Sequence, residues 1–332
     1  MAGLTVAVTG PTGEIGRAFI RSLERSREVG RIVGMARRPF DPAAHGWKRT
    51  EYRRGDVLDR ASVEGLVEGA DVVVHLAFVV LKASGETRHV NVEGSRNVFE
   101  AAVASGAKRL VYSSSVAAYG FPEDLDGPIT EDVPALGHAR HPYSAHKAEV
   151  EEVLDDALGG GETEAWVFRP CIVAGPDAPA LVAQARWPDR LPAPLASLAG
   201  AVGVLPDPGV PFQLVHHDDV ATALRAGVVG RGEAGAYNLA AAGEITMRDL
   251  ARELGLSTVP VPHLAVEAAA RVVALAPFMP AEATWIEAAR RPVLMDTSKA
   301  RRALRWRPRH DALQTLRETV AAVDAGRGAG LD

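Results

Sequence analysis

The sequence has few features that would place the protein outside the cell or in a membrane. Cys171 is the single cysteine among the 332 residues, so no disulfide can form within the chain, and this fits a reducing compartment. The N-terminal stretch MAGLTVAVTG lacks the charged segment and cleavage site of a signal peptide. The longest apolar stretches, 191–206 and 265–279, are interrupted by prolines or charges and are shorter than the about 20 residues of a spanning helix. We expect a cytoplasmic protein with no membrane partner.

The sequence also lacks an excess of positive charge. Its 37 lysines and arginines are outnumbered by 42 aspartates and glutamates, which gives a formal net charge of -5. Such a chain has no basic field to attract phosphate backbones, so nucleic acid is not an expected partner. Hydrophobic residues make up 47% of the chain and charged residues 24%, which are the proportions of a globular protein with a packed core. The expected partners are small molecules or proteins.

Short apolar runs alternate with amphipathic stretches through the first half of the chain. This alternation predicts an α/β fold in which helices connect the strands of a doubly wound parallel sheet. The predicted strands are 4–9, 31–36, 52–54, 72–76, 109–113 and 165–168, and the predicted helices between them are 14–25, 61–67, 90–104 and 143–158. After Pro170 the chain is richer in proline and loops, with helices predicted near 220–229, 247–254 and 313–322.

A glycine-rich turn follows the first predicted strand and leads directly into a helix. It reads Thr9-Gly10-Pro11-Thr12-Gly13-Glu14-Ile15-Gly16. In dinucleotide-binding folds one glycine turns the chain, one lets backbone N–H groups approach a pyrophosphate, and one lets helix and strand pack closely. The turn therefore predicts a Rossmann-type domain over 1–170 and a smaller, loop-rich substrate-binding lobe over 171–332. Segments near 211–219 and 235–240 are expected to return to the first domain. A purely structural turn is the alternative reading.

The end of the second predicted strand bears on the choice of cofactor. An acidic side chain at this place holds the ribose 2′-hydroxyl of NAD, whereas arginine accommodates the 2′-phosphate of NADP. The chain reads Gly34-Met35-Ala36-Arg37-Arg38 and offers no acid. Arg37 and Arg38 therefore favour NADP over NAD. The alternative is that both are solvated arginines of a surface loop, and the chain is rich in arginine.

A tyrosine and a lysine stand four residues apart on one predicted helix, so their side chains share a face. These are Tyr143 and Lys147. A nearby ammonium favours the phenolate and is expected to lower the pKa of the tyrosine from about 10, so that its hydroxyl can exchange a proton with a carbonyl oxygen or carbinol. Ser115 follows the predicted strand 109–113 and could hydrogen-bond the same substrate oxygen. This trio predicts a catalytic site.

The spacing of the glycines and of these residues resembles the extended short-chain dehydrogenase/reductase superfamily, also called the NAD-dependent epimerase/dehydratase family. The agreeing segments are Gly55-Asp56-Val57, His75-Leu76-Ala77, Asn91-Val92 with Gly94, Tyr112-Ser113-Ser114-Ser115 before Tyr119-Gly120, Tyr143 with Lys147, Arg169-Pro170, and His216 with Asp218-Asp219-Val220. The family pattern selects Ser115 as the functional hydroxyl. The resemblance implies cofactor contacts by the glycine loop (Gly10, Thr12, Gly13, Glu14, Ile15, Gly16), Asp56 and Val57 at the adenine, Leu76 and Ala77 near the ribose, Asn91, Tyr143, Lys147 and Pro170. It also implies that Asn91 positions the active-site helix and that the protein is a homodimer.

Departures from the family pattern narrow the expected reaction. Val116 and Ala117 stand where dehydratases carry an acidic pair, and Ile172 stands where sugar-nucleotide epimerases carry an asparagine. The apolar stretch 191–206 suits a less polar substrate. We expect a reductase or dehydrogenase acting on a carbonyl or carbinol of a small, fairly apolar metabolite. The alternatives are a nucleotide-sugar epimerase with tightly bound NAD and a dinucleotide-sensing regulator without turnover.

Metal binding is not expected. The histidines occur in two groups, His138, His141 and His146 in one and His216-His217 before Asp218-Asp219 in the other, and neither group has a recognised ligand spacing. Asp218 or Asp219 is instead expected to cap the helix predicted from residue 220.

Overall fold

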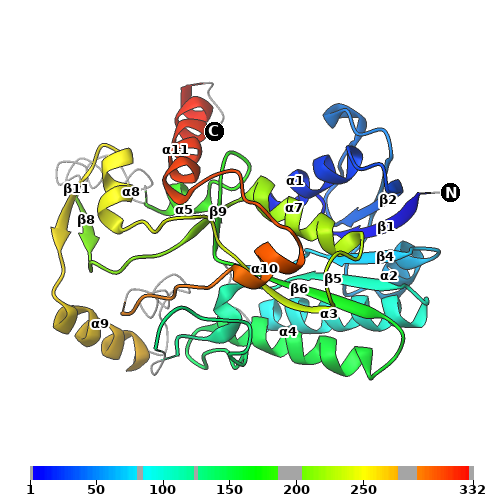
Figure 1. Ribbon diagram of the computed structural model, residues 1–332, viewed down its shortest axis with the longest axis horizontal. Coiled ribbons are helices and arrows are strands. Elements are labelled where there is room, and N and C mark those ends of the chain that lie inside the picture. Colours follow the sequence, from blue (N-terminus) through cyan, green and yellow to red (C-terminus); the bar gives the residue numbers. More distant parts are fainter. Residues whose placement is uncertain (1–2, 81–84, 123–125, 186–203, 276–289, 329–332) are drawn as a thin grey trace.

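The computed structural model describes residues 3–80, 85–122, 126–185, 204–275 and 290–328 (Figure 1). Its centre is a seven-stranded sheet in which every neighbouring pair is parallel, in the order β10-β6-β5-β4-β1-β2-β3. The strands are β1 (Leu4–Thr9), β2 (Val29–Ala36), β3 (Thr50–Arg54), β4 (Val72–His75), β5 (Arg109–Ser113), β6 (Glu164–Pro170) and β10 (Gly235–Leu239). The predicted doubly wound α/β fold is confirmed.

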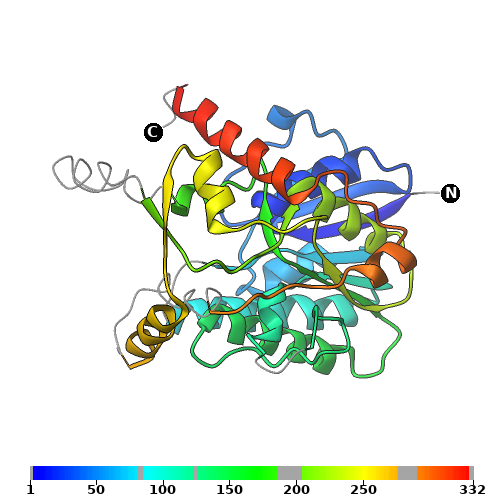
Figure 2. The ribbon, with the colours of Figure 1, turned by 60° about the vertical axis from the view of Figure 1, so that its left-hand side comes forward.

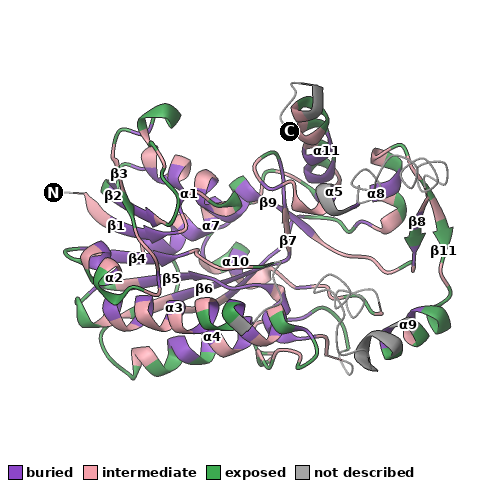
Figure 3. Cartoon of the chain, turned by 180° about the vertical axis from the view of Figure 1, so that it is seen from behind, coloured by how far each residue is buried: buried purple, intermediate pink, exposed green. Residues whose placement is uncertain are grey.

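Helices cover both faces of this sheet (Figure 1). One face carries α1 (Glu14–Glu24) and α7 (His217–Val228), and the other carries α2 (Arg60–Val67), α3 (Gly85–Ala104) and α4 (Pro142–Leu158). Alternate residues of β1 enter different cores: Val6 and Val8 pack on the α1 side and Ala7 on the α3 side. The central strands are largely buried, as their purple colour in Figure 3 shows, and strands buried on both faces are expected to be apolar throughout.

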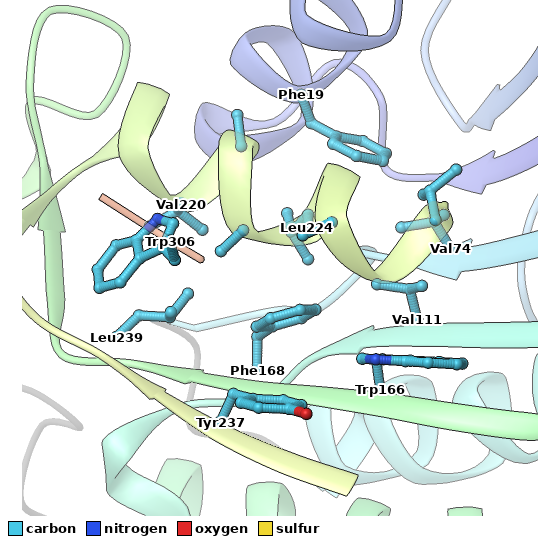
Figure 4. Close-up of a cluster of buried hydrophobic side chains, with 14 of the residues drawn as sticks. Phe19, Val74, Val111, Trp166, Phe168, Val220, Leu224, Tyr237, Leu239 and Trp306 are labelled. Atoms are coloured by element: carbon cyan, nitrogen blue, oxygen red, sulfur yellow. The ribbon is translucent and has the colours of Figure 1, made fainter. Parts of the chain in front are cut away.

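The core on the α1 side joins residues from distant parts of the chain (Figure 4). Phe168 of β6 stacks on Tyr237 of β10, with 5.9 Å between ring centroids. Trp306 reaches this core from the C-terminal part of the chain, and its indole Nε1 donates a hydrogen bond to the Asp219 carbonyl oxygen at 2.9 Å. The C-terminal segment is therefore part of the same packed unit as the sheet.

The second lobe is built from short strands and helices (Figure 2). Its strands form two separate parallel pairs, β7 (Ile172–Ala174) with β9 (Leu214–His216), and β8 (Val204–Asp207) with β11 (Ser257–Pro260). Its helices are α5 (Ala180–Ala185), α8 (Met247–Glu253), α9 (His263–Leu275) and α11 (Ala312–Gly328), whereas α10 (Ser298–Ala303) packs against β10 of the central sheet. Two 3-10 turns, η1 (Ala43–His45) and η2 (Val116–Tyr119), complete the described elements.

Two segments were expected to return to the first domain. Residues 235–240 supply β10, which pairs with β6 in the central sheet. The segment 211–219 divides: β9 pairs with β7 outside that sheet, while α7 packs against α1. Most of the apolar stretch 191–206 lies outside the described residues, and only 204–206 are seen, in β8. Among the described helices, none combines the length and the apolar character needed to cross a bilayer.

The cap of α7 differs from the expectation. The helix begins at His217, and its cap is the His216 ring, whose Nδ1 accepts a hydrogen bond from the Asp218 amide at 3.2 Å. Asp218 instead pairs with Arg21, and the Asp219 carboxylate accepts from the amides of Arg309 and His310. An aspartate before a helix is a common cap, but here each carboxylate has a tertiary partner that the sequence could not reveal.

Candidate active site

The glycine loop between β1 and α1 has the geometry that a pyrophosphate site requires. Gly10 has a φ of +72°, and a Cβ there would lie 2.8 Å from the Ala77 amide nitrogen, so both its conformation and the close approach of the chain require glycine. A Cβ at Gly16 would lie 2.1 Å from the Gly10 carbonyl oxygen. A Cβ at Gly13 meets nothing closer than 3.5 Å, and no side chain caps α1 at this residue. The amides of the first turn can therefore receive an anion, which fits a dinucleotide.

The other residues predicted at the cofactor surround this loop. Thr12 is half-buried in the loop, and Glu14 and Ile15 begin α1. Leu76 and Ala77 follow β4, and their amides donate to the Thr9 hydroxyl oxygen at 3.3 Å each. These residues lie at the carboxyl edge of the sheet, where ligands of doubly wound folds bind.

Three further predicted contacts lie at or just beyond the ends of β3 and β6. Asp56 and Val57 follow β3, and a Cβ at Gly94 would lie 2.5 Å from Val57 Cγ2, so this glycine lets α3 pack closely. Pro170 ends β6 opposite Leu239. Their contact with a cofactor stays a prediction.

Arg37 and Arg38 are exposed just beyond β2. Their carbonyl oxygens are fixed, because Arg54 Nε donates to the Arg37 oxygen at 3.1 Å and the Tyr52 hydroxyl donates to the Arg38 oxygen. Within the described part of the chain neither guanidinium has an acidic partner. Both are therefore available to a phosphate.

Ser115 and Tyr143 are brought together by β5 and α4. The Ser115 side chain is near enough to Tyr143 to lower the pKa of its hydroxyl, and Ser115 Oγ accepts a hydrogen bond from the Ala117 amide at 3.1 Å. Helix α4 starts with Pro142 at its first turn, and the His141 ring caps it by accepting from the Ser144 amide at 3.1 Å. The cap and the proline fix the position of Tyr143, which is the next residue.

Lys147 follows Tyr143 by one turn on α4, and its side chain is buried. Its Nζ donates to the Ser113 carbonyl oxygen at 2.8 Å and to the Tyr112 hydroxyl at 3.2 Å, and it lies 3.7 Å from the centroid of the Phe78 ring. Burial lowers the pKa of this amine to about 7, although the Glu151 carboxylate raises it. Lys147 is thus poised between its charged and neutral forms near neutral pH.

The electrostatics of Tyr143 differ from the expectation. The sequence predicts a pKa lowered by Lys147, but burial raises the pKa of the Tyr143 hydroxyl above its usual 10, and the Ser115 side chain lowers it only in part. The physical reason is distance, since Lys147 Nζ lies 6.0 Å from the centroid of the Tyr143 ring and points to Ser113 and Tyr112. The hydroxyl is therefore protonated at neutral pH.

Asn91 holds a different segment from the one expected. It was predicted to position the active-site helix, but its side-chain amide accepts from the Val79 amide at 2.8 Å and donates to the Val79 oxygen at 3.0 Å. This pair of bonds anchors the segment that carries Phe78, the ring beneath Lys147. The effect on the site is indirect, through the surroundings of the lysine.

A buried hydrogen-bond relay that the sequence reasoning missed links α3 to the cofactor edge. Ser95 donates to the Asn91 carbonyl oxygen at 2.5 Å, which leaves its oxygen to accept from His75 Nε2 at 2.9 Å. His75 Nδ1 then accepts from the Thr9 hydroxyl at 2.7 Å. Burial lowers the pKa of His75 to about 3, with a smaller effect from Lys147, so this ring is neutral. Its place in a motif was visible in the sequence, but its partners were not.

A second missed feature is the ion pair between Arg169 and Glu151. Glu151 follows Lys147 by four residues on α4 and accepts from Arg169 Nε at 3.0 Å and Nη2 at 2.5 Å. The exposed fractions of the two side chains are 8% and 11%. Ser114 also donates to Glu151 at 2.5 Å. The spacing from Lys147 was the available signal, since it places Glu151 on the same helix face.

Two groups of metal-binding side chains come together around His216 (with His310 and Glu318, or with His217 and Asp218). The geometry does not favour a metal. His216 Nδ1 accepts a backbone hydrogen bond, so the proton of the neutral ring is on Nε2, and the His216 and His310 rings stack with 3.9 Å between centroids. In-plane lone pairs of stacked rings do not converge on one ion.

The sequence matches a known family over most of its length. Residues 6–240 match the NAD dependent epimerase/dehydratase family. A Sinorhizobium fredii protein described as uncharacterised is 28% identical over 335 residues, which cover 97% of this chain and 79% of that protein. Human 3 beta-hydroxysteroid dehydrogenase type 7 is 36% identical over 172 residues, which cover 47% of this chain and 45% of the dehydrogenase.

The fold is also similar to solved structures. A short-chain dehydrogenase/reductase superfamily protein from Agrobacterium tumefaciens, crystallised with bound NAD, superimposes with a TM-score of 0.71 at 20% identity. The superposition covers 98% of this chain and 99% of that protein.

Proposed function

Because the chain belongs to the NAD dependent epimerase/dehydratase family, we propose that it is an NAD(P)-dependent oxidoreductase. The proposed reaction is reversible hydride transfer between the nicotinamide and a carbonyl or carbinol carbon of a small, fairly apolar metabolite. The observation that carries the proposal is the placement of Ser115 and Tyr143 together at the carboxyl edge of the sheet, with Lys147 Nζ held nearby by the Ser113 carbonyl oxygen.

The proposed chemistry divides the work between the cofactor and the chain. The bound nicotinamide supplies or accepts the hydride. Tyr143 gives its hydroxyl proton to the carbonyl oxygen during reduction and takes it back during oxidation. The raised pKa of Tyr143 keeps this proton in place at neutral pH, which suits reduction. Ser115 orients the phenol and the substrate oxygen, and the buried Lys147 ammonium, held by the Ser113 carbonyl oxygen, contributes positive charge to the site at longer range.

The substrate class is inferred from what surrounds the hydroxyls. Val116 and Ala117 follow Ser115 and pack in or against the core. Neither residue is an acid, so neither can drive an elimination. Ile172, at the start of β7, offers no amide to hold a sugar nucleotide. The partial alignment with a hydroxysteroid dehydrogenase is in keeping with an apolar substrate.

We further propose that NADP is preferred to NAD. Ala36 ends β2 without a carboxylate to bind a ribose 2′-hydroxyl, and the exposed Arg37 and Arg38 are placed to meet a 2′-phosphate.

The test starts from the purified protein. Its content of co-purified nicotinamide cofactor is measured first, and a panel of carbonyl metabolites is then screened with NADPH and with NADH by the absorbance of the reduced nicotinamide. Cofactor consumed in equal amounts with substrate, faster with NADPH, supports the proposal. Tightly bound NAD that survives turnover would instead identify an epimerase. Cofactor binding with no turnover of any carbonyl, carbinol or sugar nucleotide would indicate a regulator.

A further inference from the structure

A pocket of about 470 Å³ lies between the loop that precedes α4 and helix α9. Gly137, His138 and Arg140 line it from the loop, Glu267 and Arg271 from α9, and Arg290 from the segment after it. Pockets of this volume accommodate small-molecule ligands.

The pocket has an excess of positive charge. The Glu267 carboxylate is engaged by one arginine, because Arg290 donates to its two oxygens through Nε and Nη2 at 2.9 Å each. Among the described residues of the lining, Glu267 is the only one with a carboxylate. Arg140 and Arg271 are exposed and form no ion pair within the described ranges. Arg271 lies near enough to Glu267 to help lower the pKa of that carboxyl group. The described lining still has three guanidinium groups and one carboxylate, and this excess of positive charge favours an anion.

The pocket adjoins the proposed catalytic tyrosine. Gly137 is pressed onto the first turns of α4, since a Cβ there would lie 3.1 Å from Ala145 Cα, and its amide donates to the Ala118 oxygen at 2.8 Å. A row of ring contacts runs from His138 in the pocket wall to Phe121, then to His141, and from there to Tyr143, with centroid distances of 5.6, 5.5 and 6.3 Å. These packed rings connect the pocket wall to the position of Tyr143.

We propose that this pocket binds an anionic group, a carboxylate or a phosphate, at the end of the substrate that is remote from the reacting carbonyl. The inference rests on the proposed function and sharpens it: the substrate is an amphiphile with an apolar body and one anionic end. Arg140 and Arg271 donate charge-assisted hydrogen bonds to that end, and the Glu267–Arg290 pair fixes the wall behind it.

A binding measurement tests the pocket without relying on turnover. The protein is saturated with NADPH so that the glycine loop is filled, and octanoate, octyl phosphate and uncharged octanamide are titrated into it by calorimetry. The variants are Arg140→Gln and Arg271→Gln. The control is Arg60→Gln, which removes an exposed arginine from α2, outside the pocket.

We expect at least one anion to bind more tightly than octanamide, and each pocket variant to weaken that anion by about 10- to 100-fold. The preferred anion identifies the group as a carboxylate or a phosphate. Octanamide binding and the Arg60→Gln protein are expected to be unchanged. Absence of anion binding, or equal affinity in the wild type and both pocket variants, would overturn the inference.

Kinetic measurements separate this inference from the proposed function. With oxo-acids as substrates, the pocket variants are expected to raise KM with little change in kcat, because the anionic end does not take part in the chemistry. If anion binding depends on both arginines but the protein shows no turnover, the proposed anion site stands and the proposed oxidoreductase function is wrong. If the wild type and both variants turn over uncharged and anionic carbonyl compounds with unchanged KM values, the proposed oxidoreductase function stands and the proposed anion site is wrong.

Discussion

The Lys147 ammonium lies 3.7 Å from the centroid of the Phe78 ring. This contact belongs to the buried environment that lowers the pKa of Lys147 to about 7. Phe78 is in turn held by the segment that Asn91 anchors at Val79. A residue after β4 thus helps to set the charge of a residue on α4.

Carbonyl reduction is expected to slow as the pH rises through about 7. The charged form of Lys147 predominates below this value and is lost above it, while Tyr143 stays protonated because its pKa is raised above 10. If only the charged form is active, kcat/KM falls about tenfold for each pH unit beyond the pKa. Steady-state rates between about pH 6 and pH 9 check this, and a flat profile would contradict the role of the ammonium.

Replacing Tyr143 by phenylalanine removes the proposed proton donor and leaves the ring contact with Phe78 in place. We expect kcat to fall by about 10²- to 10⁴-fold, with NADPH affinity close to that of the wild type. Fluorescence titration of NADPH provides the control for folding and cofactor binding. Turnover near that of the wild type would show that another group supplies the proton.

The cofactor preference is tested at the end of β2. Ala36→Asp places a carboxylate where NADP would carry its 2′-phosphate, and we expect NADPH affinity to fall about tenfold or more while NADH binding is retained or improved. Ala36→Asn is the matched control because it has nearly the same shape without the charge. Equal losses in both variants would point to a steric effect and would leave the arginines without a role.

The glycines of the loop are expected to respond differently to alanine. Gly16→Ala forces a Cβ to within 2.1 Å of the Gly10 carbonyl oxygen, so we expect a loss of about 1–3 kcal/mol in the free energy of unfolding. Gly13→Ala has room for the methyl group and is expected to cost less than about 1 kcal/mol while weakening cofactor binding. Urea unfolding and cofactor titration of both variants make the comparison. The opposite order of stabilities would refute this account of the loop.

Breaking the buried ion pair is expected to destabilise the fold. Glu151→Gln leaves the Arg169 guanidinium without its charged partner in a site where its exposed fraction is 8%. We expect a loss of about 3–5 kcal/mol in the free energy of unfolding. Glu64→Gln breaks an exposed pair with Arg60 and is expected to cost less than about 1 kcal/mol. Similar losses in the two variants by urea unfolding would argue against a structural role for Glu151.

The strands of the central sheet could be predicted from sequence because burial on both faces makes them continuous apolar runs. β1 and β5 have the predicted bounds. Helix α3 begins at Gly85, before the predicted start at residue 90. The prediction missed its first turns because they carry polar residues and show no apolar stripe. The pairs β7–β9 and β8–β11 join short segments far apart in the chain, so no local pattern indicates them.

Prediction of the candidate site from sequence was limited in the same way, because contacts between distant segments leave no local pattern. Local spacing pointed to Tyr143 and Lys147 on one helix face, and the family pattern pointed to Ser115 at a strand end. Their catalytic roles stay predictions. The direction in which the Lys147 ammonium points could not be predicted, because Phe78 and Tyr112 contact it only in the folded protein. The pocket lined by Arg140 and Arg271 could not be predicted either, because these residues come from the loop before α4 and from α9, which come together only in the folded protein.

The position of β10 has a consequence for how the protein can be made. Strand β6 ends at Pro170, but its partner β10 is not synthesised until Gly235–Leu239, after β7, α5, β8, β9 and α7. On the ribosome, β6 therefore waits with one edge unpaired while much of the second lobe emerges. Exposed edges of this kind recruit other strands. A fragment that stops near residue 170 would keep that edge permanently, so the two lobes should be expressed as one chain.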